Sequence, residues 1–417
     1  MRKGAHIIKE VNIMSNLNNV ITLGIQEAGQ LILDSIKANT KISWLLVGEP
    51  GIAKTSITKW VHEQVKDTHG YVYIDCPSTD VADVAVPMVD KDNGYCTMYP
   101  NKLWGLHEFT PKIFNLDEYS KASKQTKDCL HPLFNEDRIG SIEIHPDSVV
   151  IATGNLTSDG VGDILGGQTV NRIVVIHVRK PTPEEYCAWG VSNGLNPSIM
   201  AFTHHNPKAL GSYIGMSDPS ENELIYHPKR NNNTGVGYMS PRSLEKAGKV
   251  LDLFESLDVG SEEEMRVRDK QKRAALQGTV GAAGAAELMA FLAFADEIPS
   301  PREIMADPKG AVVPAKNGAQ MMVAISALSW AGREWEQDGE VVATKRQTMA
   351  MWWEYMYKAP KDPRNLSMET IQVFKQLVEA RAQSGSVEDK DILDEMFSLK
   401  QYHNYANENK HLTQRSS

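Results

Sequence analysis

The chain has 417 residues, and its 44 Lys and Arg against 53 Asp and Glu give a formal net charge of −9. Apolar residues make up 41% and charged residues 23%, a typical composition for a globular protein of two or three domains. This charge excludes binding of a polyanion through overall electrostatics. A nucleic-acid partner would need a local basic patch, and the sequence contains no long basic run.

The cysteines and the apolar stretches indicate where the protein works. The four cysteines are scattered, without the spacing of a zinc site or a disulfide framework, which favours reduced thiols in the cytoplasm. The N-terminus lacks the continuous apolar run of a signal peptide. The most apolar later stretch, residues 281–295, is too short to span a bilayer and contains Glu287. We therefore expect a cytoplasmic protein with no membrane contact.

Five short apolar runs occur in the first 180 residues, with helix-like stretches between them. Continuous hydrophobicity is typical of strands covered on both faces, as in a parallel sheet. The pattern predicts an α/β core with crossover helices, in which ligands bind at the carboxyl ends of the strands. The predicted strands are residues 42–47, 71–74, 112–116, 148–153 and 172–178, and the main predicted helices are 55–66 and 120–134.

The first predicted strand leads into the sequence GEPGIAKTS. A phosphate-binding loop needs small residues that let backbone N–H groups turn inward, a lysine that reaches the β/γ oxygens, and a hydroxyl for magnesium. These groups stand here at the required spacing, although Ala53 replaces the last glycine. The alternative is an ordinary Gly/Pro turn before a helix, but the strand–loop–helix context favours ATP. The predicted nucleotide-binding residues are Gly48, Glu49, Pro50, Gly51, Ile52, Ala53, Lys54, Thr55 and Ser56.

Polar residues also lie after the third and fourth predicted strands and at the start of the fifth. Asp117 is expected to hold Mg²⁺ together with Thr55, and Glu118 to accept a proton from the attacking water. Asn155 could orient that water, or could simply form a turn. Arg172 could reach a neighbouring subunit's γ-phosphate as an arginine finger, or could form a surface salt bridge. Spacing alone does not choose between these two roles for Arg172.

From residue 181 the periodicity becomes helical. Ser240 followed by Pro241 predicts a helix start, which places Arg242 in the first helical turn. A basic residue is unfavourable there unless an anion such as ATP is its partner. The alternative is an i,i+3 salt bridge to Glu245.

These motifs together resemble the AAA+ superfamily, and within it the MoxR-like ATPases. The resemblance covers most of the chain, through GEPGIAKT, NLDEYSKAS, LHPLFNEDRIGSIEIHPDSVVIATGN, NRIVVIHV, PTPEEYCAWG and MSPRSLEKAGKVL. It implies Walker A at residues 48–55, Walker B at Asp117 and Glu118, sensor 1 at Asn155, an arginine finger at Arg172 and sensor 2 at Arg242. It also implies a hexameric ring and a chaperone-like remodeller that acts on a protein substrate or a von Willebrand A-type partner.

The expected organisation combines this core with helical parts. Residues 1–40 form an N-terminal helical segment, 41–180 an AAA+ core with a five-stranded parallel sheet, and 181–298 an α-helical lid with sensor 2. Residues 299–400 form a helical C-terminal region, and 401–417 a disordered tail. The Met- and Trp-rich stretch 344–357 is expected to pack in a core. An aromatic loop at 90–105 and a hairpin at 138–146 are expected to pack locally or to contact a channel or partner.

The leading hypothesis is therefore Mg²⁺-dependent ATP hydrolysis in a ring that remodels a protein. One alternative is a nucleotide-gated scaffold with little turnover, which the complete acidic pair disfavours. Another is a nucleic-acid motor or loader, which the net negative charge disfavours.

Overall fold

The computed structural model describes most of the chain up to residue 293 and shorter pieces after it. The described residues are 20–155, 172–231, 235–257, 260–293, 298–299, 301–315, 319–320, 322–323, 335–337, 340–356, 398–400, 403–404 and 407. The chain divides into two compact units. Unit 1 comprises Met1–Lys180, Ser212–Glu221 and Tyr226–Gly235, and unit 2 comprises Pro181–Gly211, Asn222–Ile225 and Val236–Ser417.

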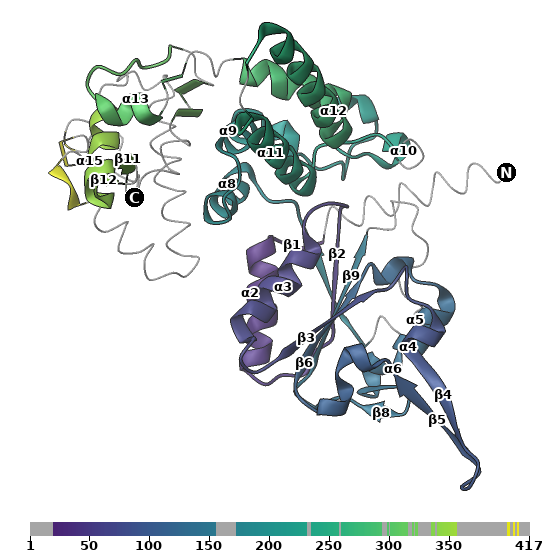
Figure 1. Cartoon of the computed structure of the whole chain (residues 1–417). Coiled ribbons are helices and arrows are strands. Elements are labelled where there is room, and N and C mark those ends of the chain that lie inside the picture. The colour runs from purple at the N-terminus through teal and green to yellow at the C-terminus, as the bar shows by residue number, and fades with distance from the viewer. Residues whose placement is uncertain are drawn as a thin grey trace. The chain divides into compact units, whose positions relative to one another are not determined.

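A six-stranded, entirely parallel sheet forms the centre of unit 1 (Figure 1). The five predicted strands are confirmed, and a sixth was missed because its two residues are too few for a recognisable apolar run. The strand order is β1 (Thr22–Leu23), β10 (Val174–Val178), β2 (Trp44–Gly48), β9 (Val149–Asn155), β6 (Lys112–Asp117) and β3 (Gly70–Asp75).

Alternate residues of each central strand enter two different cores, which is why the strands are apolar throughout. In β2, Trp44 and Leu46 pack with α2 (Ile25–Lys37) and α3 (Lys54–Val65) on one face. Leu45 and Val47 pack on the other face with α5 (Lys124–Leu130) and α6 (Pro132–Asn135). The helices therefore cover both sides of the sheet and leave its carboxyl edge for polar residues.

The single helix predicted over residues 120–134 is broken into three pieces. A 3-10 turn, η3 (Tyr119–Lys121), comes first, then α5 and α6. Ser123 begins α5 by accepting a hydrogen bond from the Thr126 N–H at 3.0 Å. Pro132, which has no N–H to donate, is the first residue of α6.

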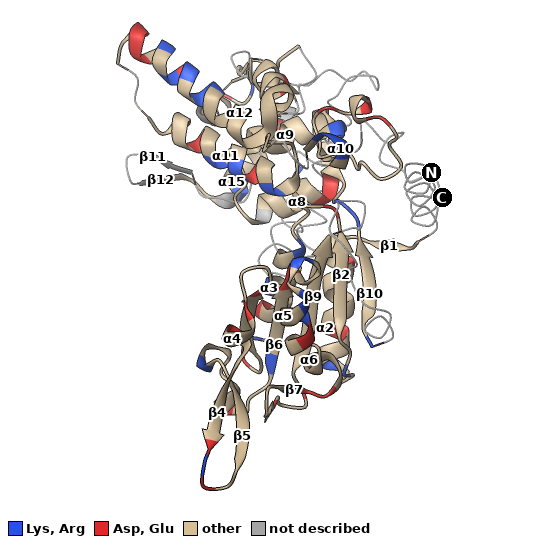
Figure 2. Ribbon diagram, turned by 90° about the vertical axis from the view of Figure 1, so that its right-hand side faces the viewer, with Lys and Arg blue, Asp and Glu red and all other residues tan. Residues whose placement is uncertain are grey.

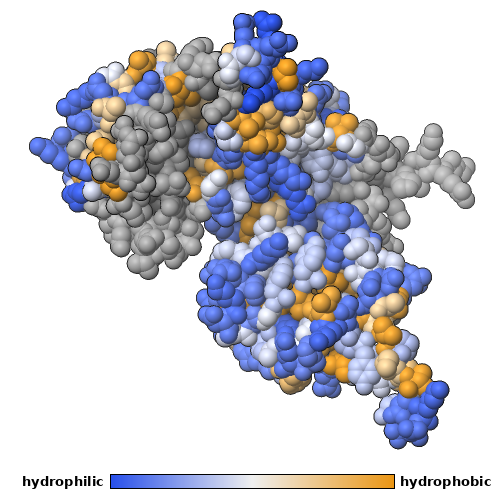
Figure 3. Space-filling model, in the orientation of Figure 1, coloured by the Kyte–Doolittle hydropathy of each residue, from blue (hydrophilic) through white to orange (hydrophobic). Residues whose placement is uncertain are grey.

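The segment between β3 and β6, predicted as a loop at residues 90–105, forms regular secondary structure. After α4 (Val81–Val84), an antiparallel hairpin forms from β4 (Ala85–Asp90) and β5 (Tyr95–Pro100), followed by η1 (Lys102–Trp104) and η2 (Leu106–Glu108). Trp104 is buried in the core, as local packing predicted. Tyr95 and Tyr99 are instead more than half exposed on the hairpin, where apolar residues gather behind a hydrophilic tip (Figure 3). The predicted hairpin at 138–146 is confirmed as β7 (Arg138–Ile139) and β8 (Ile142–Glu143).

Unit 2 is mainly helical. Its elements include α8 (Pro183–Ser192), α9 (Pro197–His205), η5 (Pro207–Leu210), α11 (Pro241–Glu255), α12 (Glu262–Leu292), α13 (Pro301–Ala306) and α15 (Lys345–Met356). The predicted start of α11 is confirmed, because the Ser240 hydroxyl accepts from the Ser243 N–H and Pro241 comes first in the helix. Trp352 and Trp353 are buried, which confirms the predicted core role for the described part of 344–357. An antiparallel pair, β11 (Trp335–Gln337) and β12 (Glu340–Ala343), was not predicted. The short η6 (Pro219–Glu221) and α10 (Pro228–Asn231) belong to unit 1.

Helix α12 is the one described helix whose length and composition would allow a membrane span. It is interrupted at Gly281, where the backbone has φ 82 and ψ 168. A side chain there would place its Cβ 2.3 Å from the Gly237 carbonyl oxygen, so the kink follows from a close backbone contact. The apolar piece after the kink, residues 282–292, is about 16 Å long, compared with about 30 Å for a bilayer core.

Candidate active site

The GEPGIAKTS loop joins β2 to α3 and has two residues with left-handed backbone. Gly51 has φ 76, and Ala53, at the N-cap of α3, has φ 74 and ψ 31. Gly48 is needed for a different reason, because a Cβ there would lie 2.5 Å from the Val178 carbonyl oxygen. The loop therefore turns tightly at the N-terminus of α3, where unpaired N–H groups and the helix dipole favour an anion.

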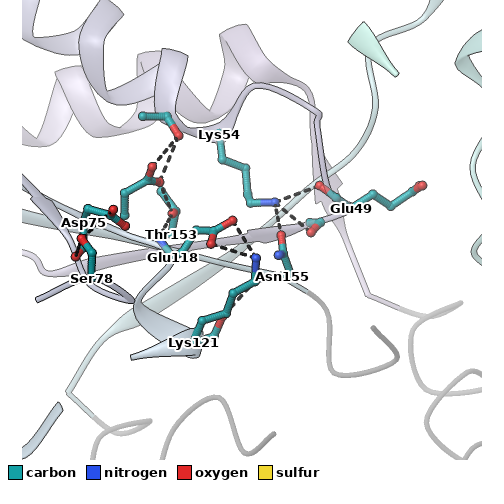
Figure 4. A network of polar contacts seen from close by, with 12 residues as sticks. Glu49, Lys54, Asp75, Ser78, Glu118, Lys121, Thr153 and Asn155 are labelled. Carbon is teal, nitrogen blue, oxygen red and sulfur yellow. Dashed lines mark hydrogen bonds and ion pairs between the residues drawn. The ribbon is translucent and has the colours of Figure 1, made fainter. Parts of the chain in front are cut away.

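Lys54 is buried beneath this loop and points along it. Its Nζ donates to Gly48 O at 2.9 Å, to Glu49 O at 2.8 Å and to Asn155 Oδ1 at 2.9 Å. Asn155 ends β9 and stands opposite Gly48 in the parallel pairing. Sheet register thus brings together two residues separated by a hundred positions in the sequence (Figure 4).

Asp117 ends β6 and is held by three hydroxyl groups. Thr153 donates to Oδ1 at 2.7 Å and Tyr73 donates to Oδ2 at 3.1 Å. Thr55, the second residue of α3, lies 3.0 Å from Oδ1 and 3.2 Å from Oδ2. Adjacent ligands of an octahedral Mg²⁺ ion, bound at about 2.1 Å, are about 3.0 Å apart. The Thr55 hydroxyl and the Asp117 carboxylate are hard oxygen donors at this spacing, so they fit magnesium.

Glu118 follows Asp117 with a left-handed backbone, φ 51. Its N–H donates to the Thr153 hydroxyl at 2.9 Å, so Thr153 orients both members of the acidic pair. Both carboxylate oxygens of Glu118 accept from Lys121 Nζ at 2.8 Å (Figure 4). Each side chain of this ion pair is more than one-third exposed, so the pair is weak and readily broken.

Two neighbours of the acidic edge, Tyr73 and Cys76, have raised pKa values. Burial, reinforced by the charge of Asp117, raises the pKa of Tyr73 far above its ordinary value. Burial is also the main reason that the pKa of Cys76 is raised, to about 12, with Asp117 and Asp75 adding to the effect. Tyr73 therefore remains a hydrogen-bond donor to Asp117, and Cys76 remains a neutral thiol near neutral pH.

Glu49 is in contact with residues that sequence analysis did not select. Its Oε2 lies 3.0 Å from Lys180 Nζ, and its Oε1 accepts from Ser212 Oγ at 2.5 Å. The Glu49 and Lys180 side chains are only 3% and 4% exposed. The contact between Lys180 Nζ and Glu49 Oε2 is an ion pair but not a hydrogen bond. Among the described residues, Oε2 accepts no hydrogen bond.

The structure also describes the two predicted arginines, and both are exposed. Arg172 is exposed just before β10, with NH1 3.4 Å from His131 Nε2. Arg242 is exposed in the first turn of α11, in unit 2. The alternative salt bridge to Glu245 is wrong for this structure, since Glu245 instead pairs with Lys249 at 2.7 Å. The structure thus gathers the Walker-type residues and Asn155, and it leaves both arginines accessible.

Five further polar residues belong to the site or support it: Tyr73, Lys121, Thr153, Lys180 and Ser212. A threonine two positions before Asn155, inside an apolar strand, is a signal that could have identified Thr153. Lys180 and Ser212 carry no such signal, because their contact with Glu49 depends on the tertiary fold alone.

Comparison with known proteins identifies the type of domain. Residues 43–169 match the family model of the AAA domain (dynein-related subfamily), and this match supports a nucleotide-dependent ATPase of that general kind. No curated protein matches the chain.

Solved structures of a branch migration motor also match, at low similarity. The RuvB Holliday junction branch migration motor of Thermotoga maritima matches with a TM-score of 0.32 and 12% identity, covering 68% of this chain and 74% of that chain. A single-residue variant of the RuvB from that bacterium matches with a TM-score of 0.32 and 11% identity, covering 59% and 68%. Likeness at this level does not bear on what the present chain binds.

Proposed function

We propose that this protein is a Mg²⁺-dependent ATPase that works in an oligomeric ring and remodels a protein partner, in the manner of MoxR-like AAA+ proteins. One observation carries the proposal. The neighbouring strands β2, β9 and β6 end at one edge of the sheet, where Asn155 ends β9 and Asp117 ends β6. There they meet Lys54 and Thr55, the first two residues of α3, which follows β2 through the loop.

Each group has a part in phosphate chemistry. The N–H groups of the loop and Lys54 would hold the β- and γ-phosphates, so Lys54 must exchange some of its present acceptors for phosphate oxygens. Thr55 and Asp117 would hold Mg²⁺, which neutralises charge on the phosphates when bound. Glu118, once free of Lys121, can accept the proton of the attacking water, and Asn155 can orient that water.

The assembly and the partner are the further parts of the proposal. Arg172 would complete a neighbouring subunit's site, and its exposed side chain supports this role. Arg242 would respond to the γ-phosphate from the lid. Its neighbour Glu245 pairs with Lys249 instead, so the exposed Arg242 side chain is accessible to an anion. The proposed assembly is a hexameric ring in the cytoplasm that acts on a protein substrate or a von Willebrand A-type protein. In such a ring both arginines would contact the γ-phosphate.

ATP turnover of Lys54→Ala and Glu118→Gln tests the chemistry. Both should lose most activity, while Lys59→Ala and Glu63→Gln, which change exposed residues of α3, should retain it. Full activity of either site variant would refute the assignment. Dilution below the assembly concentration should also abolish turnover, and a fully active monomer would exclude a trans role for Arg172.

The Glu118–Lys121 ion pair favours one alternative, a nucleotide-gated scaffold with little turnover. In the arrangement seen here the proposed base is occupied by a cation on both oxygens. A single-turnover experiment that finds bound but uncleaved ATP would support the scaffold. A nucleic-acid motor has no comparable support. The basic cluster of α12 directly follows the acidic start of that helix (Figure 2), and Arg266 and Arg273 pair with Glu262 and Asp269.

A further inference from the structure

The proposed ATPase chemistry assigns no role to the carboxylate of Glu49. Phosphate binding uses the backbone of the loop and Lys54, so the Glu49 carboxylate is not needed for it. That carboxylate is nevertheless buried, against Lys180 at 3.0 Å and Ser212 at 2.5 Å. Burial of a charge is unfavourable unless partners compensate it, so loss of a partner should displace Glu49 and the loop that carries it.

The backbone of Glu49 is part of the phosphate-binding machinery. Its carbonyl oxygen accepts from Lys54 Nζ at 2.8 Å. Gly48, before it, approaches β10 closely at Val178, and Pro50, after it, has a fixed φ. The first half of the loop is thus fixed against the end of β10, whereas the second half carries the left-handed residues Gly51 and Ala53.

Lys180 and Ser212 lie where the chain passes between the two units. Unit 1 ends at Lys180, and Pro181 begins unit 2. The chain returns to unit 1 at Ser212. A single carboxylate, on the phosphate-binding loop, therefore contacts the residues at both of these crossings.

We infer that Lys180 and Ser212 are positioning residues that act on the phosphate-binding loop through Glu49. Their contact links nucleotide binding to the backbone at the first two of the chain's five crossings between the units. When bound nucleotide draws Lys54 away from the Glu49 carbonyl, the Glu49 backbone shifts. The Glu49 side chain then moves relative to its partners Lys180 and Ser212. This inference rests on the proposed nucleotide site.

Calorimetric titration of the full chain with Mg²⁺ and ADP tests the positioning role. Lys180→Met should weaken ADP binding by about tenfold or more, because an unpaired buried carboxylate displaces the loop. Lys112→Met is a control for removing a buried, ion-paired lysine. Lys112 lies at the amino end of β6 and forms an ion pair at 3.0 Å with Glu108, whose side chain is exposed. This variant should lower stability without weakening ADP binding.

The double variant Glu49→Gln/Lys180→Met should recover much of the affinity lost in Lys180→Met, because the neutral pair buries no charge. Additive losses, or an unchanged affinity in Lys180→Met, would overturn the inference. If Lys180→Met does not fold, Ser212→Ala, which removes only a hydroxyl group, should weaken ADP binding by about threefold. An unchanged Kd there would likewise refute it.

Hydrogen exchange tests the link to the crossing. ADP should slow exchange of the backbone amides of residues 176–180 in the wild-type chain, and this slowing should disappear in the double variant although ADP still binds. Equal slowing in both proteins would contradict the link. A wild-type chain that does not bind ADP would instead refute the proposed function, so the two failures are distinct.

Discussion

Ala53 allows a quantitative test of how the phosphate-binding loop is built. Its left-handed backbone, φ 74 and ψ 31, costs a residue with a Cβ about 1–2 kcal/mol. Glycine removes this cost but gives the unfolded chain extra freedom, which lowers stability by about 0.4–1 kcal/mol. The difference between the central values of these ranges predicts that Ala53→Gly raises the free energy of unfolding of unit 1 by about 0.8 kcal/mol, within a range of about 0–1.6 kcal/mol.

Native-state hydrogen exchange of the β2 amides measures this free energy in unit 1 specifically. The matched control is Ala38→Gly, at the exposed C-cap of α2, where φ is −79 and there is no left-handed backbone strain for glycine to relieve. That variant should lose about 0.4–1 kcal/mol. If Ala53→Gly loses as much as the control, the argument from backbone strain is wrong.

Three further predictions concern the acidic edge and the sheet. Thr153→Val removes the hydroxyl that orients Asp117 and Glu118, and the lost hydrogen bonds are worth about 1–3 kcal/mol. It should lower kcat at least about tenfold with a smaller change in ADP affinity, and an unchanged kcat would contradict this. Lys121→Ala frees Glu118 from an exposed ion pair and should raise basal kcat by no more than about fivefold, whereas a fall in steady-state turnover would assign Lys121 a positive role. Burial lowers the pKa of His177, so the stability gained by keeping it neutral is present above the unfolded pKa of about 6.5 and is lost as the pH falls through the folded pKa. The urea midpoint should therefore fall between about pH 7.5 and about pH 5.5, and this fall should be smaller in His177→Gln; an equal fall would exclude His177 as a cause.

Local sequence determined much of the core. The apolar runs predicted five of the six strands. Three of them, β2, β6 and β9, are buried on both faces, where few polar residues are tolerated. The edge strand β1 was missed because two residues carry no pattern. The helix over 120–134 was wrong in detail because Ser123 and Pro132 interrupt it.

Sequence by itself also determined the chemistry at the strand ends, since spacing within one motif fixes the relation of Lys54 to Thr55 and of Asp117 to Glu118. Only the tertiary structure decided which distant groups meet them. Parallel register sets Asn155 opposite the start of the loop, and the fold of unit 1 buries Lys180 against Glu49. The physical reason is that hydrogen-bonded register and burial of charge depend on residues far apart in the chain, which no local pattern encodes.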